Sequence, residues 1–194
     1  MEIDIGNFHY TGYNPSNTTL KEMRLMMNEA FMSLWCITSA PLITCNDLRN
    51  MDQAIFNILT DKYAVGVNQN YLNHGGDNIL YFNITDKFRQ EYLNQVESNG
   101  NMTEMFYKPM PTKFGDAAFV FLNRDETQSG FHKMNVEFNQ LPLTYNHNDD
   151  LECMVYDIWN KSTIKSTSYN ANLYPQSVKF ILLSNCTSVT VNDS

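Results

Sequence analysis

The chain has 194 residues, of which 43% are hydrophobic and 13% aromatic, so it has enough apolar material for a folded core and is not a disordered tail. The formal net charge of -8 argues against a nucleic-acid groove or an anionic membrane surface as partner, because no cluster of Lys and Arg is present to neutralise phosphates. No apolar run approaches the roughly 20 residues of a membrane span, and the first residues lack the basic flank and apolar segment of a signal peptide. A neutral or sugar-like ligand remains compatible with this composition.

The first third of the chain has the pattern of helix, buried strand and helix. Over residues 20–35 apolar side chains recur every three or four positions, which predicts an amphipathic helix. Pro41 prevents its continuation, and residues 42–45 are predicted to form a buried strand. Asn50 is predicted to cap a second helix, whose apolar side chains fall within residues 51–59.

The predicted strand ends abruptly at a polar group, Asn46-Asp47-Leu48-Arg49. A buried parallel strand needs neighbouring strands and covering helices, and in a (β/α)₈ barrel the polar residues directly after a strand line the mouth of the active site. Asn46, Asp47 and Arg49 are therefore candidates for contact with a substrate. The alternative is that Asn46 and Asp47 only begin the next loop and that Arg49 pairs with a carboxylate.

A connection and an all-β region follow. Residues 67–76 are polar and end in two glycines, which suits a linker between domains. Beyond them, short segments rich in β-branched and aromatic residues predict an antiparallel sandwich, and the helical spacing over residues 86–96 predicts a helix inserted among its first strands. The predicted strands are residues 79–82, 105–108, 117–123, 134–138, 154–159 and 178–183.

Six Asn-X-Ser/Thr triplets are many for this length and predict a glycosylated secretory or lysosomal protein. The alternative is that a chain rich in Asn, Ser and Thr forms such triplets by chance. The candidate acceptors are Asn17, Asn83, Asn101, Asn160, Asn185 and Asn192.

The four cysteines have none of the spacings typical of a metal site, so no metal is predicted, and no cofactor either. Cys36 and Cys45 lie in apolar surroundings and are expected to be buried thiols. The sequence leaves open whether Cys153 and Cys186 pair.

Several motifs, in their order and spacing, match a known family. They are Ile5-Gly6-Asn7-Phe8, Ser33-Leu34-Trp35, Ala40-Pro41-Leu42-Ile43, Asn46-Asp47-Leu48-Arg49, Val67-Asn68-Gln69, Lys108-Pro109, Arg124 after residues 117–123, Val155-Tyr156-Asp157-Ile158-Trp159, and Pro175 before residues 178–183. With these motifs the chain resembles glycoside hydrolase family 27, which holds α-galactosidases and α-N-acetylgalactosaminidases. The resemblance implies a fold class of α/β plus all-β: residues 1–66 as the last strands and helices of an incomplete (β/α)₈ barrel, residues 67–76 as a linker, and residues 77–194 as a C-terminal antiparallel β-sandwich.

The resemblance also implies retaining hydrolysis of terminal α-linked galactose from glycolipids, glycoproteins or oligosaccharides, a lysosomal or secreted full-length protein, and a homodimer. Such hydrolysis needs two carboxylates about 5–5.5 Å apart. The family's nucleophile lies in a Lys-Tyr-Asp-type motif that this sequence lacks, and the position of its acid/base falls on Met1. The chain is therefore expected to have no catalytic residue of its own, to be inactive alone, and to be cut from a longer secreted precursor.

Besides a gene fragment with no stable product, two alternatives stay open. One is an α-N-acetylgalactosaminidase, because the residues that distinguish the two sugars would lie before this chain. The other is a non-catalytic sandwich that binds carbohydrate or another subunit, in which Trp159, Tyr169 and Tyr174 would form a stacking platform unless they pack in the core.

Overall fold

The computed structural model describes residues 20–44, 47–70, 77–78, 86–112, 115–125, 131–141 and 150–189. The helices are α1 (Leu20–Ile37), α2 (Gln53–Leu59), α3 (Lys62–Gln69) and α4 (Asp86–Ser98), and a short 3₁₀ helix spans Phe138–Gln140. The strands are β1 (Asp77–Asn78), β2 (Thr103–Thr112), β3 (Gly115–Asn123), β4 (His132–Glu137), β5 (Asp150–Asp157), β6 (Ser162–Ser166), β7 (Ser168–Leu173) and β8 (Val178–Val189).

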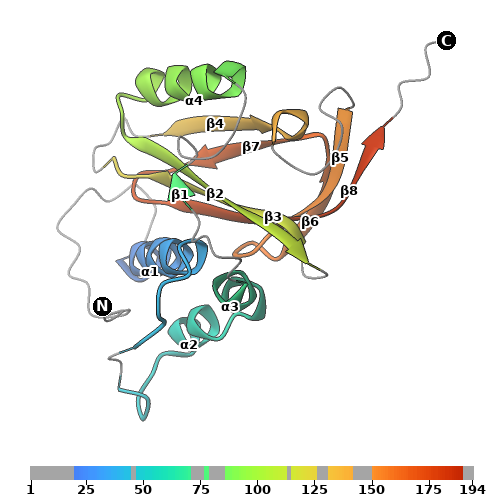
Figure 1. Cartoon of the computed structure of the whole chain (residues 1–194). Coiled ribbons are helices and arrows are strands. Elements are labelled where there is room, and N and C mark those ends of the chain that lie inside the picture. Colours follow the sequence, from blue (N-terminus) through green and yellow to red (C-terminus); the bar gives the residue numbers. More distant parts are fainter. Residues whose placement is uncertain are drawn as a thin grey trace.

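The described strands form two antiparallel sheets, one of six strands in the order β1-β2-β3-β8-β5-β6 and one that pairs β4 with β7. Figure 1 shows α4 beyond the two-stranded sheet, whereas α1, α2 and α3 lie on the opposite side of the six-stranded sheet. The predicted fold class, helices of an α/β unit followed by an antiparallel sandwich, is confirmed.

The central strands β3 and β8 are buried on both faces. Phe119 and Phe121 pack in a core with α4 and the two-stranded sheet, while Val120 and Phe180 pack on the other face in a second core with α1. A strand covered on both faces is apolar at every position instead of every second one. This explains the continuous apolar run of residues 117–122 and makes the six-stranded sheet common to both cores.

Polar contacts also tie the helices to the sandwich. Lys108 of β2 is buried, and its ammonium group donates hydrogen bonds to the Val67 carbonyl of α3 and to the Ser39 hydroxyl after α1. Burial lowers the pKa of Lys108 to about 8. The Trp159 indole N–H donates to Ser33 Oγ of α1 at 2.9 Å. These contacts join segments that lie far apart in the sequence.

The predicted helices are present, but the cap of the second one differs from the prediction and α3 was not predicted. The predicted first helix is confirmed as α1. The cap of α2 is Asp52 and not Asn50, because the Asp52 carboxylate accepts a hydrogen bond from the Ala54 amide at 2.8 Å. Helix α3 continues through Gln69, so the first three residues assigned to a linker are helical. Asp61 caps α3 by accepting hydrogen bonds from two backbone amides, which allows a helix to begin directly after α2.

The buried strand predicted at residues 42–45 is wrong for the residues described there. Thr44 forms a single bridge, and Ile43 is 52% exposed. Burial of a strand needs hydrogen-bonded strands at its edges and helices on its faces, and none of the described sheet strands pairs with residues 41–43. Cys45 lies outside the described residues. None of the helices in the described ranges is long and apolar enough for a membrane span.

Five of the predicted strands are present as β2, β3, β4, β5 and β8, and the inserted helix is α4. Phe138 and Trp159 lie just beyond β4 and β5, and the strand predicted over residues 79–82 lies outside the described residues. Strands β6 and β7 were not predicted: STIKS is polar at most positions, and SYNANL alternates polar and apolar residues over only six positions.

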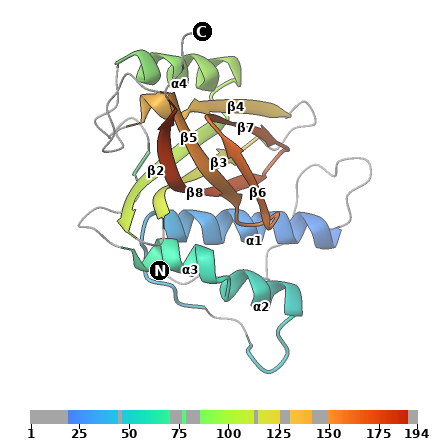
Figure 2. The ribbon, with the colours of Figure 1, turned by 90° about the vertical axis from the view of Figure 1, so that its right-hand side faces the viewer.

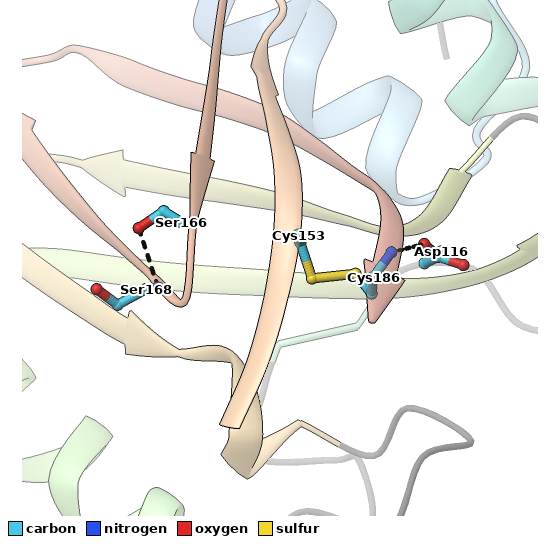
Figure 3. Close-up of a disulfide and its surroundings, with 5 residues drawn as sticks. All are labelled: Asp116, Cys153, Ser166, Ser168 and Cys186. Carbon is cyan, nitrogen blue, oxygen red and sulfur yellow. Dashed lines mark hydrogen bonds between the residues drawn. A yellow bond between two sulfur atoms is a disulfide. The ribbon is translucent and has the colours of Figure 1, made fainter. Parts of the chain in front are cut away.

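Cys153 of β5 and Cys186 of β8 form a disulfide, which answers the question that the sequence left open. Figure 3 shows the bridge between the two paired strands and the nearby hydrogen bond from the Cys186 amide to Asp116 Oδ2, which is 3.0 Å long. Cys36 is a buried free thiol, as expected.

Candidate functional site

The structure pairs Asp47 and Arg49 with each other. Arg49 Nε lies 2.9 Å from Asp47 Oδ1, Arg49 Nη2 lies 3.0 Å from Oδ2, and the Arg49 amide also donates to Oδ1 at 3.0 Å. The side-chain and backbone hydrogen bonds from Arg49 lower the pKa of Asp47, and the bond to Asp47 raises the pKa of Arg49. The Arg49 side chain is 86% exposed. This arrangement matches the alternative in which Arg49 pairs with a carboxylate, while Asn46 lies outside the described residues.

Replacing both members of this pair, as Asp47→Asn with Arg49→Ala, is expected to leave the midpoint of thermal unfolding unchanged. An exposed ion pair in solvent contributes little to stability, and Asn still accepts the backbone hydrogen bond that shapes the turn. Circular dichroism during heating measures the effect. A drop of several degrees would show that the pair supports more of the fold than its own turn.

A more enclosed site lies between α1 and strands β5–β8. It is a cleft of about 470 Å³ whose lining includes Glu29 of α1, Asp157 at the end of β5 and Lys179 of β8. The three aromatic residues singled out in the sequence, Trp159, Tyr169 and Tyr174, all line it. Figure 2 shows α1 running beneath β8 and β6 on this side of the molecule. The fold thus gathers these aromatic residues around one cavity.

Asp157 organises one wall of the cleft. Its carboxylate is buried and accepts hydrogen bonds from the Asn160 side chain at 2.8 Å and from the backbone amides of Trp159 and Asn160 at 3.2 and 3.0 Å. Lys179 Nζ lies 3.3 Å from the same carboxylate, and the Tyr169 hydroxyl lies 3.4 Å from it. Burial, followed by the nearby charge of Asp157, raises the pKa of Tyr169. Asp157 therefore holds the wall in place through groups on three segments, the turn after β5, β7 and β8.

Glu29 has a different environment in the same cleft. Among the hydrogen bonds of the described residues its carboxyl group makes none, and the pKa of Glu29 is raised to about 7. Burial is the main cause, the charge of Asp157 adds to it, and Lys179 and Lys161 partly offset it. The sequence reasoning missed Glu29. The sequence indicates its role only weakly. Met26, Glu29 and Ser33 share one helix face, and only the structure shows what covers that face.

Three of the predicted glycosylation acceptors lie in described segments. Asn101, Asn160 and Asn185 are all exposed. The acceptor nitrogen of Asn160 donates to Asp157 Oδ2, whereas no hydrogen bond from the side chains of Asn101 or Asn185 occurs within the described segments. Asn17, Asn83 and Asn192 lie outside the described residues.

Two family models match the chain in sequence. Residues 15–70 match a model described as alpha galactosidase A, and residues 100–183 match the alpha galactosidase C-terminal beta sandwich domain. Together the two models match well over half of the chain in the order expected for one protein. The chain belongs to the α-galactosidase family, glycoside hydrolase family 27. The sandwich of β2–β8 is the C-terminal domain of that family.

Relatives of this α-galactosidase-family chain are similar over most of its length. Alpha-galactosidase A of Cellvibrio japonicus is 28% identical over 142 residues, which are 70% of this chain and 30% of the relative. The structure of α-galactosidase I from Mortierella vinacea has a TM-score of 0.62 and 15% identity over 89% of this chain and 39% of its own. A GH27 β-L-arabinopyranosidase from Geobacillus stearothermophilus has a TM-score of 0.60 and 17% identity over 93% of this chain and 33% of its own. The chain thus spans less than half the length of each of these relatives.

Proposed function

We propose that the chain supplies the C-terminal part of an α-galactosidase that hydrolyses terminal α-linked galactose from glycolipids, glycoproteins or oligosaccharides with retention of configuration. The observation that carries this proposal is the match of the helical segment and of the sandwich to two α-galactosidase models, in that order. The sheet shared by the two cores supports the view that both segments act as parts of one larger molecule. We further propose that residues 1–66 belong to the catalytic barrel and residues 77–194 to the sandwich, with the linker beginning after α3.

We also propose that these 194 residues do not hydrolyse α-galactosides alone. Retaining hydrolysis needs a nucleophilic carboxylate and an acid/base carboxylate facing the same bond. The sequence has no Lys-Tyr-Asp triplet, the motif type in which the family resemblance places the nucleophile. Asp47 is paired with Arg49 in an exposed turn, which does not suit it as a substitute.

The purified chain is expected to release 4-nitrophenol from 4-nitrophenyl α-D-galactopyranoside no faster than a buffer blank. A complete α-galactosidase serves as the positive control, and a cooperative thermal transition of the same sample shows that the chain is folded. Turnover that survives repurification would contradict the proposal. In that case Glu29→Gln would show whether the carboxyl group in the cleft is responsible.

The proposed location is lysosomal or secreted. The Cys153–Cys186 disulfide supports passage through an oxidising compartment, where such bridges form and persist. The exposed acceptor residues Asn101 and Asn185 support it as well. A homodimer of the complete enzyme is part of this proposal, and light scattering on the full-length protein tests it.

Expression in a eukaryotic secretory host is expected to give glycans on Asn101 and Asn185 but little on Asn160. The reason is that the Asn160 side-chain nitrogen is held by the buried Asp157 carboxylate at 2.8 Å. Mass spectrometry of peptides before and after treatment with peptide N-glycosidase measures the occupancy of each position. A glycan on Asn160 with bare Asn101 and Asn185 would contradict the expectation.

A further inference from the structure

We propose that the cleft between α1 and strands β5–β8 is a binding site for a neutral saccharide of one or two sugar units. The inference goes beyond hydrolysis, because it concerns recognition by the sandwich and α1 and needs no catalytic carboxylate. The cleft volume of about 470 Å³ falls within the range of about 300–1,000 Å³ of small-molecule sites. Figure 2 places its elements side by side, with α1 passing below β6 and β8.

The polar groups of the cleft fall into two sets. The first set is already engaged and forms a rigid wall: the Asp157 carboxylate holds the Asn160 side chain, and the Trp159 indole N–H is bound to Ser33. The second set makes no hydrogen bond within the described part of the chain and consists of the Glu29 carboxyl group and the side-chain amides of Asn170 and Asn172 on β7. A fixed wall with free groups around it is the arrangement that orients a small ligand.

The free groups suit hydroxyl groups better than any other ligand chemistry. An amide offers two N–H donors and a carbonyl acceptor, and a carboxyl group adds acceptors, so each sugar hydroxyl can both donate and accept. The charges around the cleft nearly balance, because Asp157 faces Lys179, the nearby Lys161 is paired with Asp61, and the pKa of Glu29 is raised to about 7. A cleft with this balance has no strong preference for an ion of either sign, which favours a neutral ligand.

Tyr174 supplies the apolar surface that a sugar ring needs. Its side chain lines the cleft, the residue is 58% exposed, and its ring is positioned by an edge-on contact with Phe131 at 5.3 Å between centroids. An aromatic side chain with a large exposed surface, placed beside free amides, combines stacking with hydrogen bonding. Trp159 contributes less, because its ring already lies beside Phe180 and below Lys161.

The test is a titration of the ¹⁵N-labelled chain with D-galactose, N-acetyl-D-galactosamine, D-glucose and D-mannose, followed by NMR. We expect at least one sugar to shift the Trp159 indole and Asn172 side-chain resonances in a saturable way. Tyr174→Ala should weaken the binding of that sugar about tenfold. The matched control is Phe56→Ala, which removes an aromatic ring that is 48% exposed on α2, outside the cleft.

A second variant keeps the test decisive if Tyr174→Ala does not fold. Asn172→Ala should weaken binding about two- to tenfold through the loss of hydrogen bonds, whereas Asn94→Ala on α4 should leave it unchanged. The proposal is overturned if none of the four sugars shifts the cleft resonances, or if the shifts occur elsewhere. It is also overturned if the control variants weaken binding as much as the cleft variants. Because no turnover is measured, these outcomes are separate from failure of the proposed hydrolase function.

Discussion

Replacing Cys153 and Cys186 together by alanine is expected to lower the free energy of unfolding by about 3–4 kcal/mol. The bridge joins positions 33 residues apart in the sequence and therefore restricts the unfolded chain, which raises its free energy relative to the folded state. Both residues are buried in the core beneath α4 and the two-stranded sheet. Removal of the two sulfur atoms therefore adds a packing penalty, which is smaller than the effect of losing the bridge. Denaturation in guanidinium chloride, followed by tryptophan fluorescence, measures the change.

Reductant provides the control for this prediction. Wild-type chain in reductant should approach the stability of the double variant, while reductant should leave the double variant unaffected. Cys36 is a buried thiol without a bridge and is present in both proteins, so it does not distinguish them. Wild-type stability that does not change under full reduction would show that the bridge does not hold the sandwich together.

Replacing Glu29 by glutamine is expected to stabilise the protein above about pH 7 by about 1–3 kcal/mol and to have little effect below about pH 4.5. The folded chain holds the Glu29 proton up to about pH 7, whereas the unfolded chain loses it near 4.5. Between these values the folded state binds more protons, so ionisation of Glu29 lowers stability as the pH rises. Glutamine cannot ionise, so the variant avoids this loss. Because the site is partly exposed, the gain in unfolding free energy is smaller than the full pKa shift of Glu29 would give.

The difference in unfolding free energy between Glu29→Gln and wild type, measured across this pH window, isolates Glu29 from the other carboxyl groups. Asp157, Lys179 and Lys161 face Glu29 and are the same in both proteins. Glu97→Gln, on the exposed surface of α4, is the matched control for the replacement of a glutamate by glutamine. If the difference for Glu29→Gln is flat with pH, the carboxyl group does not sit in the environment that the fold gives it.

The spacing of apolar residues was sufficient to predict an element where that spacing matches the side of the element that is buried in the fold. The three- and four-residue spacing in residues 20–35 predicted α1, and that of residues 86–96 predicted α4. The apolar runs predicted β3 and β8, although they did not show that both faces would be covered. The polar strand β6 carries no such signal, because its side chains are exposed or partly exposed and it is held mainly by backbone pairing with β5, whereas β7 buries Ala171 and Leu173 within a short segment.

The residues of the candidate site also differ in how far the sequence could predict them. Asp47 and Arg49 were candidates in the sequence because polar residues follow an apolar run there. The partner of a side chain depends on the geometry of the fold, however, and in the structure the two residues pair with each other in solvent. Glu29 did not stand out, since a carboxylate on a helix is usually a solvated one. Its significance depends on the strands that close over it, which come from the far end of the chain.

By itself, the amino-acid sequence determined α1, α2 and α4, the apolar central strands and the resemblance to glycoside hydrolase family 27, because these depend on residue order along the chain. Only the tertiary structure decided which cysteines pair, that Ile43 and Thr44 are exposed, and that Glu29 and Asp157 share one cleft with Tyr174. The physical reason is that bridges, burial and pKa shifts arise between residues brought together by packing, and local periodicity does not determine those distances.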